Sequence, residues 1–99
     1  MSVYLVGQAT VKDAAALAAY AEKAGPTIPA GATVLALDES TETIEGDEAP
    51  PRTIIIEFPS REAFRAWYDS PEYQAVLPLR LRAAPGNACL VEGVPPPSA

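Results

Sequence analysis

The side chains that could carry chemistry in this sequence are few, because it contains no histidine and one cysteine, Cys89. Typical zinc sites and nucleophiles activated by histidine are therefore excluded. Proton transfer and charge stabilisation then depend on carboxylates, tyrosine, lysine and arginine. The acidic cluster of Glu45, Asp47 and Glu48 lacks the spacing of a calcium loop. We therefore expect no metal site and no cofactor.

The strongest candidate for a catalytic group is Glu57, near the end of the apolar run RTIIIEF. The alternation of a strand puts Glu57 on one face with Thr53 and Ile55. A carboxylate on that face, at the mouth of a barrel, could act as a general base or orient a ligand. The alternative is a structural glutamate that pairs with an arginine or caps neighbouring backbone.

Two pairs of side chains could contact a small molecule. Tyr4 and Gln8 lie on one face of a strand and could point into the same cavity, although such groups more often hydrogen-bond across an interface. Trp67 and Tyr68 could form a pocket wall. With Phe64, however, they have the spacing by which a helix packs on a sheet.

Arginine supplies a candidate group for binding an anion. Arg80 and Arg82 follow Tyr73 in a helical segment, an arrangement that would suit an anion clamp. Solvated arginines, or ion pairs with Asp69 and Glu72, are the simpler interpretation. The candidate ligand-binding residues are therefore Tyr4, Gln8, Trp67, Tyr68 and Arg80.

Local patterns assign these residues to strands and helices. Helices are predicted to begin after Asp13, Ser60 and Ser70, each of which is a favourable N-cap residue. Pro78 should break or kink the third helix, because it lacks an N–H group. Cys89 lies in an apolar strand and is expected in the core. Strands are predicted at residues 3–11, 32–38, 52–58 and 88–94, with the second resuming at 41–45 after a kink.

The resulting βαββαβ order is the α+β, ferredoxin-like pattern, a four-stranded antiparallel sheet with helices on one face. We expect one domain over residues 1–94 and a disordered, proline-rich tail over residues 95–99. Tyr4, Val6 and Ile55 fall on the sheet face without helices, which is too apolar to face water alone. The prediction is a homodimer in which two such faces pack together, as in a dimeric α/β barrel.

Charge and composition restrict the partners and the location. The chain of 99 residues has a formal net charge of −6 and no run of basic residues, so nucleic acid and anionic membranes are poor partners. Its start has no basic segment, and its apolar stretch is too short for a signal peptide or a membrane span. We expect a cytoplasmic protein.

One stretch is also similar to a known family. The segment IIIEFPSREAFRAWYDSPEYQAVLPLRLRAA resembles the domain-of-unknown-function 1330 family, and YLVGQATVKDAAALAAYAEKAGPTI and LVEG resemble it more weakly. The resemblance implies a ferredoxin-like subunit of a dimeric α/β barrel and no established activity. The wider superfamily includes cofactor-independent monooxygenases and lactone isomerases, and many members depend on histidine, which this chain lacks.

Three functions are consistent with these observations. The first is a dimer that binds a small apolar or aromatic molecule at or near the sheet interface. The second is a cofactor-independent isomerase or monooxygenase-like enzyme, with Glu57 as general base and Tyr4 or Gln8 stabilising an enolate-like charge. The third is a purely structural or interaction protein, which a fully packed interface would favour.

Overall fold

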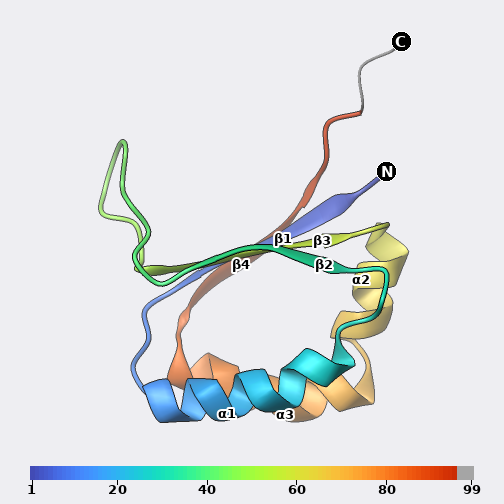
Figure 1. Ribbon diagram of the computed structural model, residues 1–99, viewed down its shortest axis with the longest axis horizontal. Coiled ribbons are helices and arrows are strands. Elements are labelled where there is room, and N and C mark those ends of the chain that lie inside the picture. The colour runs from blue at the N-terminus through green and yellow to red at the C-terminus, as the bar shows by residue number, and fades with distance from the viewer. Residues whose placement is uncertain (96–99) are drawn as a thin grey trace.

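Strands and helices follow the predicted βαββαβ order in a computed structural model that describes residues 1–95 (Figure 1). The predicted tail lies outside the described residues from residue 96 onwards. The strands are β1 (Val3–Ala9), β2 (Thr33–Asp38), β3 (Arg52–Phe58) and β4 (Gly86–Glu92). The helical segments are α1 (Ala14–Ala24), the 3-10 turn η1 (Gly25–Thr27), α2 (Arg61–Tyr68) and α3 (Pro71–Ala83).

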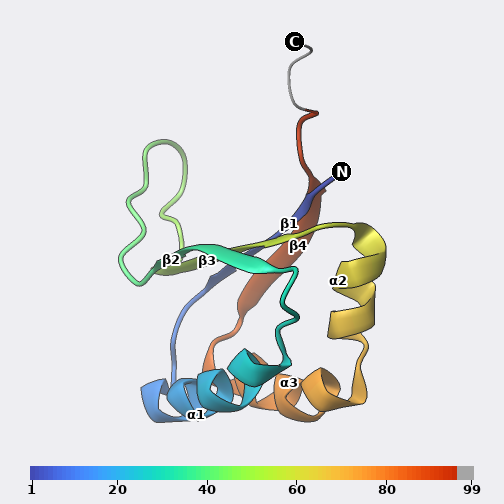
Figure 2. The same ribbon diagram turned by 45° about the vertical axis from the view of Figure 1, so that its right-hand side comes forward.

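The four strands form one antiparallel sheet in the order β2-β3-β1-β4, with Leu5 of β1 opposite Ile56 of β3 and Leu90 of β4. Both views show the helices on one side of this sheet, with α1 and α3 packed together beneath it and α2 at one end (Figures 1 and 2). The ferredoxin-like fold expected from the sequence is therefore confirmed.

The three predicted N-caps set the starts of the three α-helices. The side chain of Asp13 accepts a hydrogen bond from the backbone N–H of Ala16, and Ser60 and Ser70 cap α2 and α3 in the same way. Each cap satisfies one of the N–H groups that the first turn of a helix leaves without a partner. Ser70 also ends α2, because its hydroxyl donates to the carbonyl of Trp67.

Two local predictions were wrong. Pro78 was expected to break or kink α3, and the break was wrong. The helix continues through Pro78, which is exposed, so the carbonyl freed at the preceding turn can turn toward water. Residues 41–45 do not extend β2. They belong to the connection between β2 and β3, where the side chain of Thr41 donates instead to the backbone carbonyl of Pro51 at 3.0 Å.

Aromatic rings fill the core between α2, α3 and the end of β3. Phe58 is fully buried, and its ring centroid lies 5.3 Å from that of Phe64 and 5.4 Å from that of Trp67. Trp67 in turn lies 4.1 Å from Tyr73, measured between ring centroids. The rings of α2 therefore fasten that helix to the sheet, as their helical spacing predicted.

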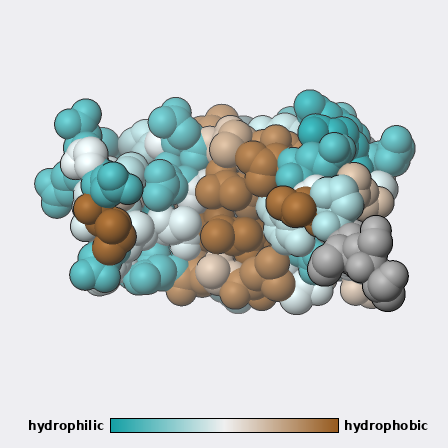
Figure 3. All heavy atoms as spheres, turned by 90° about the horizontal axis from the view of Figure 1, so that it is seen from above, coloured by the Kyte–Doolittle hydropathy of each residue, from teal (hydrophilic) through white to brown (hydrophobic). Residues whose placement is uncertain are grey.

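The opposite face of the sheet has no covering element among residues 1–95. Val6 and Ile55 lie opposite each other in the register of β1 and β3, and Cys89 of β4 faces the same way. Figure 3 looks onto this open face and shows an apolar band across its middle, between hydrophilic regions. The prediction that Cys89 lies in the core was wrong for the single subunit. Its side chain is exposed, because Ala88 and Leu90 take the positions that face the helices.

Within the described residues, no helix has the length and apolar character needed to cross a bilayer.

Candidate functional site

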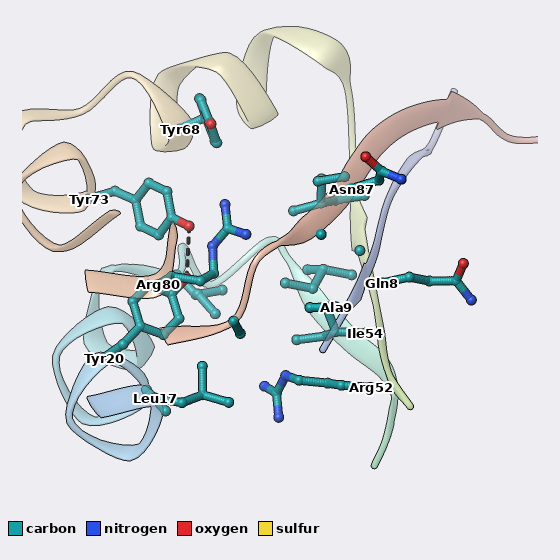
Figure 4. A pocket seen from close by; sticks show the side chains of 18 of the residues that line it. Gln8, Ala9, Leu17, Tyr20, Arg52, Ile54, Tyr68, Tyr73, Arg80 and Asn87 are labelled. Carbon is teal, nitrogen blue, oxygen red and sulfur yellow. Dashed lines mark hydrogen bonds between the residues drawn. The ribbon is translucent and has the colours of Figure 1, made fainter. Parts of the chain in front are cut away.

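A cavity of about 150 Å³ lies between the sheet and the helices. Its walls come from the helix-facing side of β1, β3 and β4 and from the inner sides of α1 and α3, and Trp67 and Tyr68 of α2 also line it (Figure 4). Most of its walls are apolar. The apolar side chains around it include Leu5, Leu17, Ile28, Ile54, Ile56 and Ala88.

Two phenols meet on the helical wall of the cavity. The hydroxyl oxygens of Tyr20, from α1, and Tyr73, from α3, lie 2.7 Å apart in a hydrogen bond (Figure 4). Burial raises the pKa of Tyr20 well above its ordinary value, and the bond to Tyr73 raises it further. Tyr20 is therefore a neutral hydrogen-bonding group near neutral pH and not a general base.

The guanidinium of Arg80 lies beside these phenols and points into the cavity (Figure 4). Burial alone would lower the pKa of Arg80, but the neighbouring Tyr73, Tyr20 and Tyr68 outweigh burial and raise that pKa. The side chain is thus a permanent cation. Among residues 1–95, no carboxylate forms an ion pair with it, including the two expected partners, Asp69 and Glu72.

A second arginine reaches the cavity from the sheet. Arg52, at the start of β3, points toward Leu17 of α1 (Figure 4) and has only 15 % of its side chain exposed. It forms an ion pair with Glu39, which follows β2. The charge of Arg52 is therefore compensated within the protein, whereas that of Arg80 is not compensated by a described residue.

Glu57 and Tyr4 lie on the open face, away from this cavity. The Tyr4 hydroxyl donates to Oε2 of Glu57 at 3.3 Å, across the pairing of β1 and β3. The negative charge of Glu57 is the main cause of the raised pKa of Tyr4. Neither residue lines the cavity, so the geometry does not bring Glu57 together with Trp67, Tyr68 and Arg80.

Gln8 touches the cavity through its position on β1, but its amide points to the other side of the sheet (Figure 4). There its Nε2 donates to Oγ1 of Thr53 at 3.1 Å. Thr53 in turn shares a hydrogen bond of 2.7 Å with the hydroxyl of Thr41. These hydrogen bonds tie β1 and β3 to the segment that follows β2, so the amide of Gln8 has a partner within the subunit.

The structure thus divides the candidate residues between two faces of the sheet. Trp67, Tyr68 and Arg80 are together at the cavity, and Tyr4, Gln8 and Glu57 point to the open face.

Sequence reasoning did not select Tyr20, Arg52 or Leu17 as site residues. Their positions were available from the patterns, because Leu17 and Tyr20 share the inner stripe of the first helix. Strand alternation likewise puts Arg52 on the face of Ile54. The patterns did not show that a cavity lies between these residues.

Acidic side chains and Cys89 form no group that could hold a metal ion within the described part of the chain.

Solved structures resemble the whole chain. A protein of unknown function from Rhodopseudomonas palustris is 22% identical with a TM-score of 0.78, and the match covers 96% of this chain and 84% of that one. A putative antibiotic biosynthesis monooxygenase from Chloroflexus aurantiacus is 17% identical with a TM-score of 0.57, and the match covers 99% of this chain and 98% of that one. At these identities the likenesses show the fold alone.

A comparison with curated proteins finds no match. The family described as "Domain of unknown function (DUF1330)" matches residues 2–94, nearly the whole chain. The match confirms the resemblance seen in the sequence and covers all the described strands and helices, so the chain belongs to the DUF1330 family.

Proposed function

We propose that the protein is a cytoplasmic homodimer that binds one small apolar or aromatic molecule in each subunit, in the cavity between the sheet and the helices. The observation that carries this proposal is the cavity itself, about 150 Å³ of space walled by Trp67, Tyr68, Tyr73 and aliphatic side chains. An apolar cavity of about this volume is large enough to bind benzene. The proposed ligand is therefore about the size of a single ring.

The cavity differs from an ordinary packing defect by its polar groups. Apolar walls with a few convergent polar side chains are typical of small-molecule sites, and here Arg80, Tyr20 and Tyr73 converge on one wall. A core selected only for packing would fill such a space with apolar atoms, because interiors are close-packed. Binding is thus a better explanation of this arrangement than packing alone.

Catalysis by Glu57 receives less support. A ligand in the cavity would be separated from Glu57 by the sheet, and no carboxylate is among the described residues that line the cavity. The Tyr4 hydroxyl already donates a hydrogen bond to one carboxylate oxygen of Glu57. A reaction with Glu57 as base would need a substrate on the open face, in the space where we place the second subunit.

The homodimer is supported by the open face. Its middle is apolar and its margins are hydrophilic (Figure 3), which is the usual anatomy of a protein interface. The connection between β2 and β3 projects on the same side as this face (Figures 1 and 2) and carries Ile44, which is 79 % exposed. A second copy, related by a two-fold axis, would cover the apolar bands of both subunits at once.

The cytoplasmic location is supported by the cysteine content. Cys89 is the single cysteine and cannot form a disulfide within the chain. The absence of internal disulfides is typical of a reducing compartment.

Filling the cavity tests the binding proposal. Ala88 faces the helices from β4 and lines the cavity, so Ala88→Phe should occupy the space that a ligand ring would take. Ala75→Phe is the matched control, because Ala75 is exposed on α3 and does not line the cavity. Binding of single-ring aromatic compounds, charged and neutral, is followed by the fluorescence of Trp67, which is the single tryptophan and part of the cavity wall.

We expect saturable fluorescence changes in the wild type and in Ala75→Phe, and none in Ala88→Phe. Bound ligand should also raise the unfolding temperature with concentration, by mass action. The proposal is contradicted if no single-ring compound perturbs Trp67, or if Ala88→Phe binds as well as the control.

A further inference from the structure

We propose that the cavity selects a small aromatic monocarboxylate, whose ring occupies the apolar space and whose carboxylate is bound by Arg80 beside the Tyr20 and Tyr73 hydroxyls. This inference rests on the proposed function, because it requires that the cavity binds a ligand, and it adds the charge and the chemical class of that ligand.

The first argument is the uncompensated charge of Arg80. Its guanidinium is half-buried in a mostly apolar cavity, and among residues 1–95 no carboxylate pairs with it. A buried charge is unfavourable unless an opposite charge and hydrogen bonds compensate it. The protein has thirteen acidic residues, and none of those described is placed at this position. An anionic ligand would supply the missing partner.

The second argument is a count of hydroxyl hydrogens. The hydroxyls of Tyr20 and Tyr73 have two hydrogens, and the 2.7 Å bond between them uses one. The other is free to be donated to a ligand oxygen, next to the N–H groups of Arg80 (Figure 4). One phenol and the guanidinium are therefore donors toward the same space. Converging donors, with no carboxylate among the described lining residues, favour a ligand carboxylate, whose two oxygens accept a bidentate pair from arginine.

The third argument concerns the number of charges. Among the described lining residues, Arg52 is the other cation, and Glu39 already compensates its charge. One free cation favours a ligand with a single negative charge. On the opposite wall, the described residues Leu5, Ile54 and Ile56 are apolar, and the charge of Arg52 on β3 is already paired with Glu39. The ring of the ligand would lie against this wall.

The test compares benzoate with benzamide, which have the same shape and differ in charge. Binding to the wild-type protein is measured at pH 7 by Trp67 fluorescence and by calorimetry. We expect benzoate to bind about 10- to 100-fold more tightly, as hydrogen bonds between charged partners contribute more than neutral ones. Arg80→Met should abolish this preference, while Arg82→Met, an exposed site on the same helix, should retain it.

Each outcome has a defined meaning. Equal binding of benzoate and benzamide to the wild type would overturn the charge selection and leave the proposed function intact. Binding of neither compound would count against a cavity open to a single ring, and so against both proposals. A preference for benzoate that persists in Arg80→Met would show that another group binds the carboxylate. The wild-type comparison remains decisive even if Arg80→Met fails to fold.

Discussion

The proposed homodimer makes a strong prediction for Ile55→Lys. Ile55 lies in the middle of the open face, opposite Val6 on β1 and Ala36 on β2, and is already half-buried in the single subunit. Completing its burial in the dimer would contribute about 1 kcal/mol per subunit to the free energy of dimerisation. Placing an ammonium group there would cost at least about 2 kcal/mol more per subunit, because its hydration is lost. Because the dimer is two-fold symmetric, both costs occur twice. Ile55→Lys should therefore weaken the free energy of dimerisation by about 6 kcal/mol, which raises the dimer dissociation constant by about four orders of magnitude.

The assay is sedimentation equilibrium or size-exclusion chromatography with light scattering, over a range of protein concentrations. The wild type should be a dimer at micromolar concentration, and Ile55→Lys should be a monomer with unchanged far-UV circular dichroism. Leu81→Lys is the matched control, since Leu81 is an exposed apolar residue on α3, and it should remain a dimer. The thiol of Cys89 should react slowly in the dimer and rapidly in Ile55→Lys. A monomeric wild type, or a dimeric Ile55→Lys, would refute the assigned interface.

Two further predictions concern the subunit itself. A Cβ added at Gly86 would lie 2.6 Å from the Cα of Ala9, so Gly86→Ala should lower the free energy of unfolding by more than about 1 kcal/mol in urea titrations. Gly25→Ala, where nothing lies within 4 Å, should be neutral or stabilising, and equal losses at both sites would contradict this account. The raised pKa of Tyr20 means that the unfolded chain loses this proton first as the pH rises, so stability should fall above about pH 10. Tyr20→Phe should weaken that fall. If the urea midpoint depends on pH in the same way in Tyr20→Phe and in the wild type, this prediction is contradicted.

The elements of the fold could be predicted because they depend on local chemistry. Asp13, Ser60 and Ser70 each offer a side-chain oxygen to the first turn of a helix, and the structure uses all three. Pro78 shows where local chemistry misleads. Its missing N–H weakens a helix, but an exposed position lets water replace the lost bond, and whether the position is exposed depends on tertiary packing.

Sequence reasoning identified only part of the candidate site. Trp67, Tyr68 and Arg80 were selected by residue type, and the structure places all three at one cavity. The cavity itself could not be predicted, because its volume depends on how far α1 and α3 stand from the sheet. Tyr4 and Glu57 lie on the other face of the sheet, away from this cavity. Strand alternation assigned each residue to a face correctly, but it did not show which face borders empty space.

Strand β3 connects the two proposals, because its three consecutive isoleucines serve both faces of the sheet. Ile54 and Ile56 line the cavity, whereas Ile55 lies between them and points to the open face. If each subunit holds a complete cavity, as the lining residues indicate, monomeric Ile55→Lys should bind benzoate with nearly the wild-type affinity. A large loss of affinity in that monomer would instead mean that the second subunit stabilises the walls of the cavity through β3. Ligand binding to the monomer therefore distinguishes a dimer that only protects an apolar surface from one that also maintains the site.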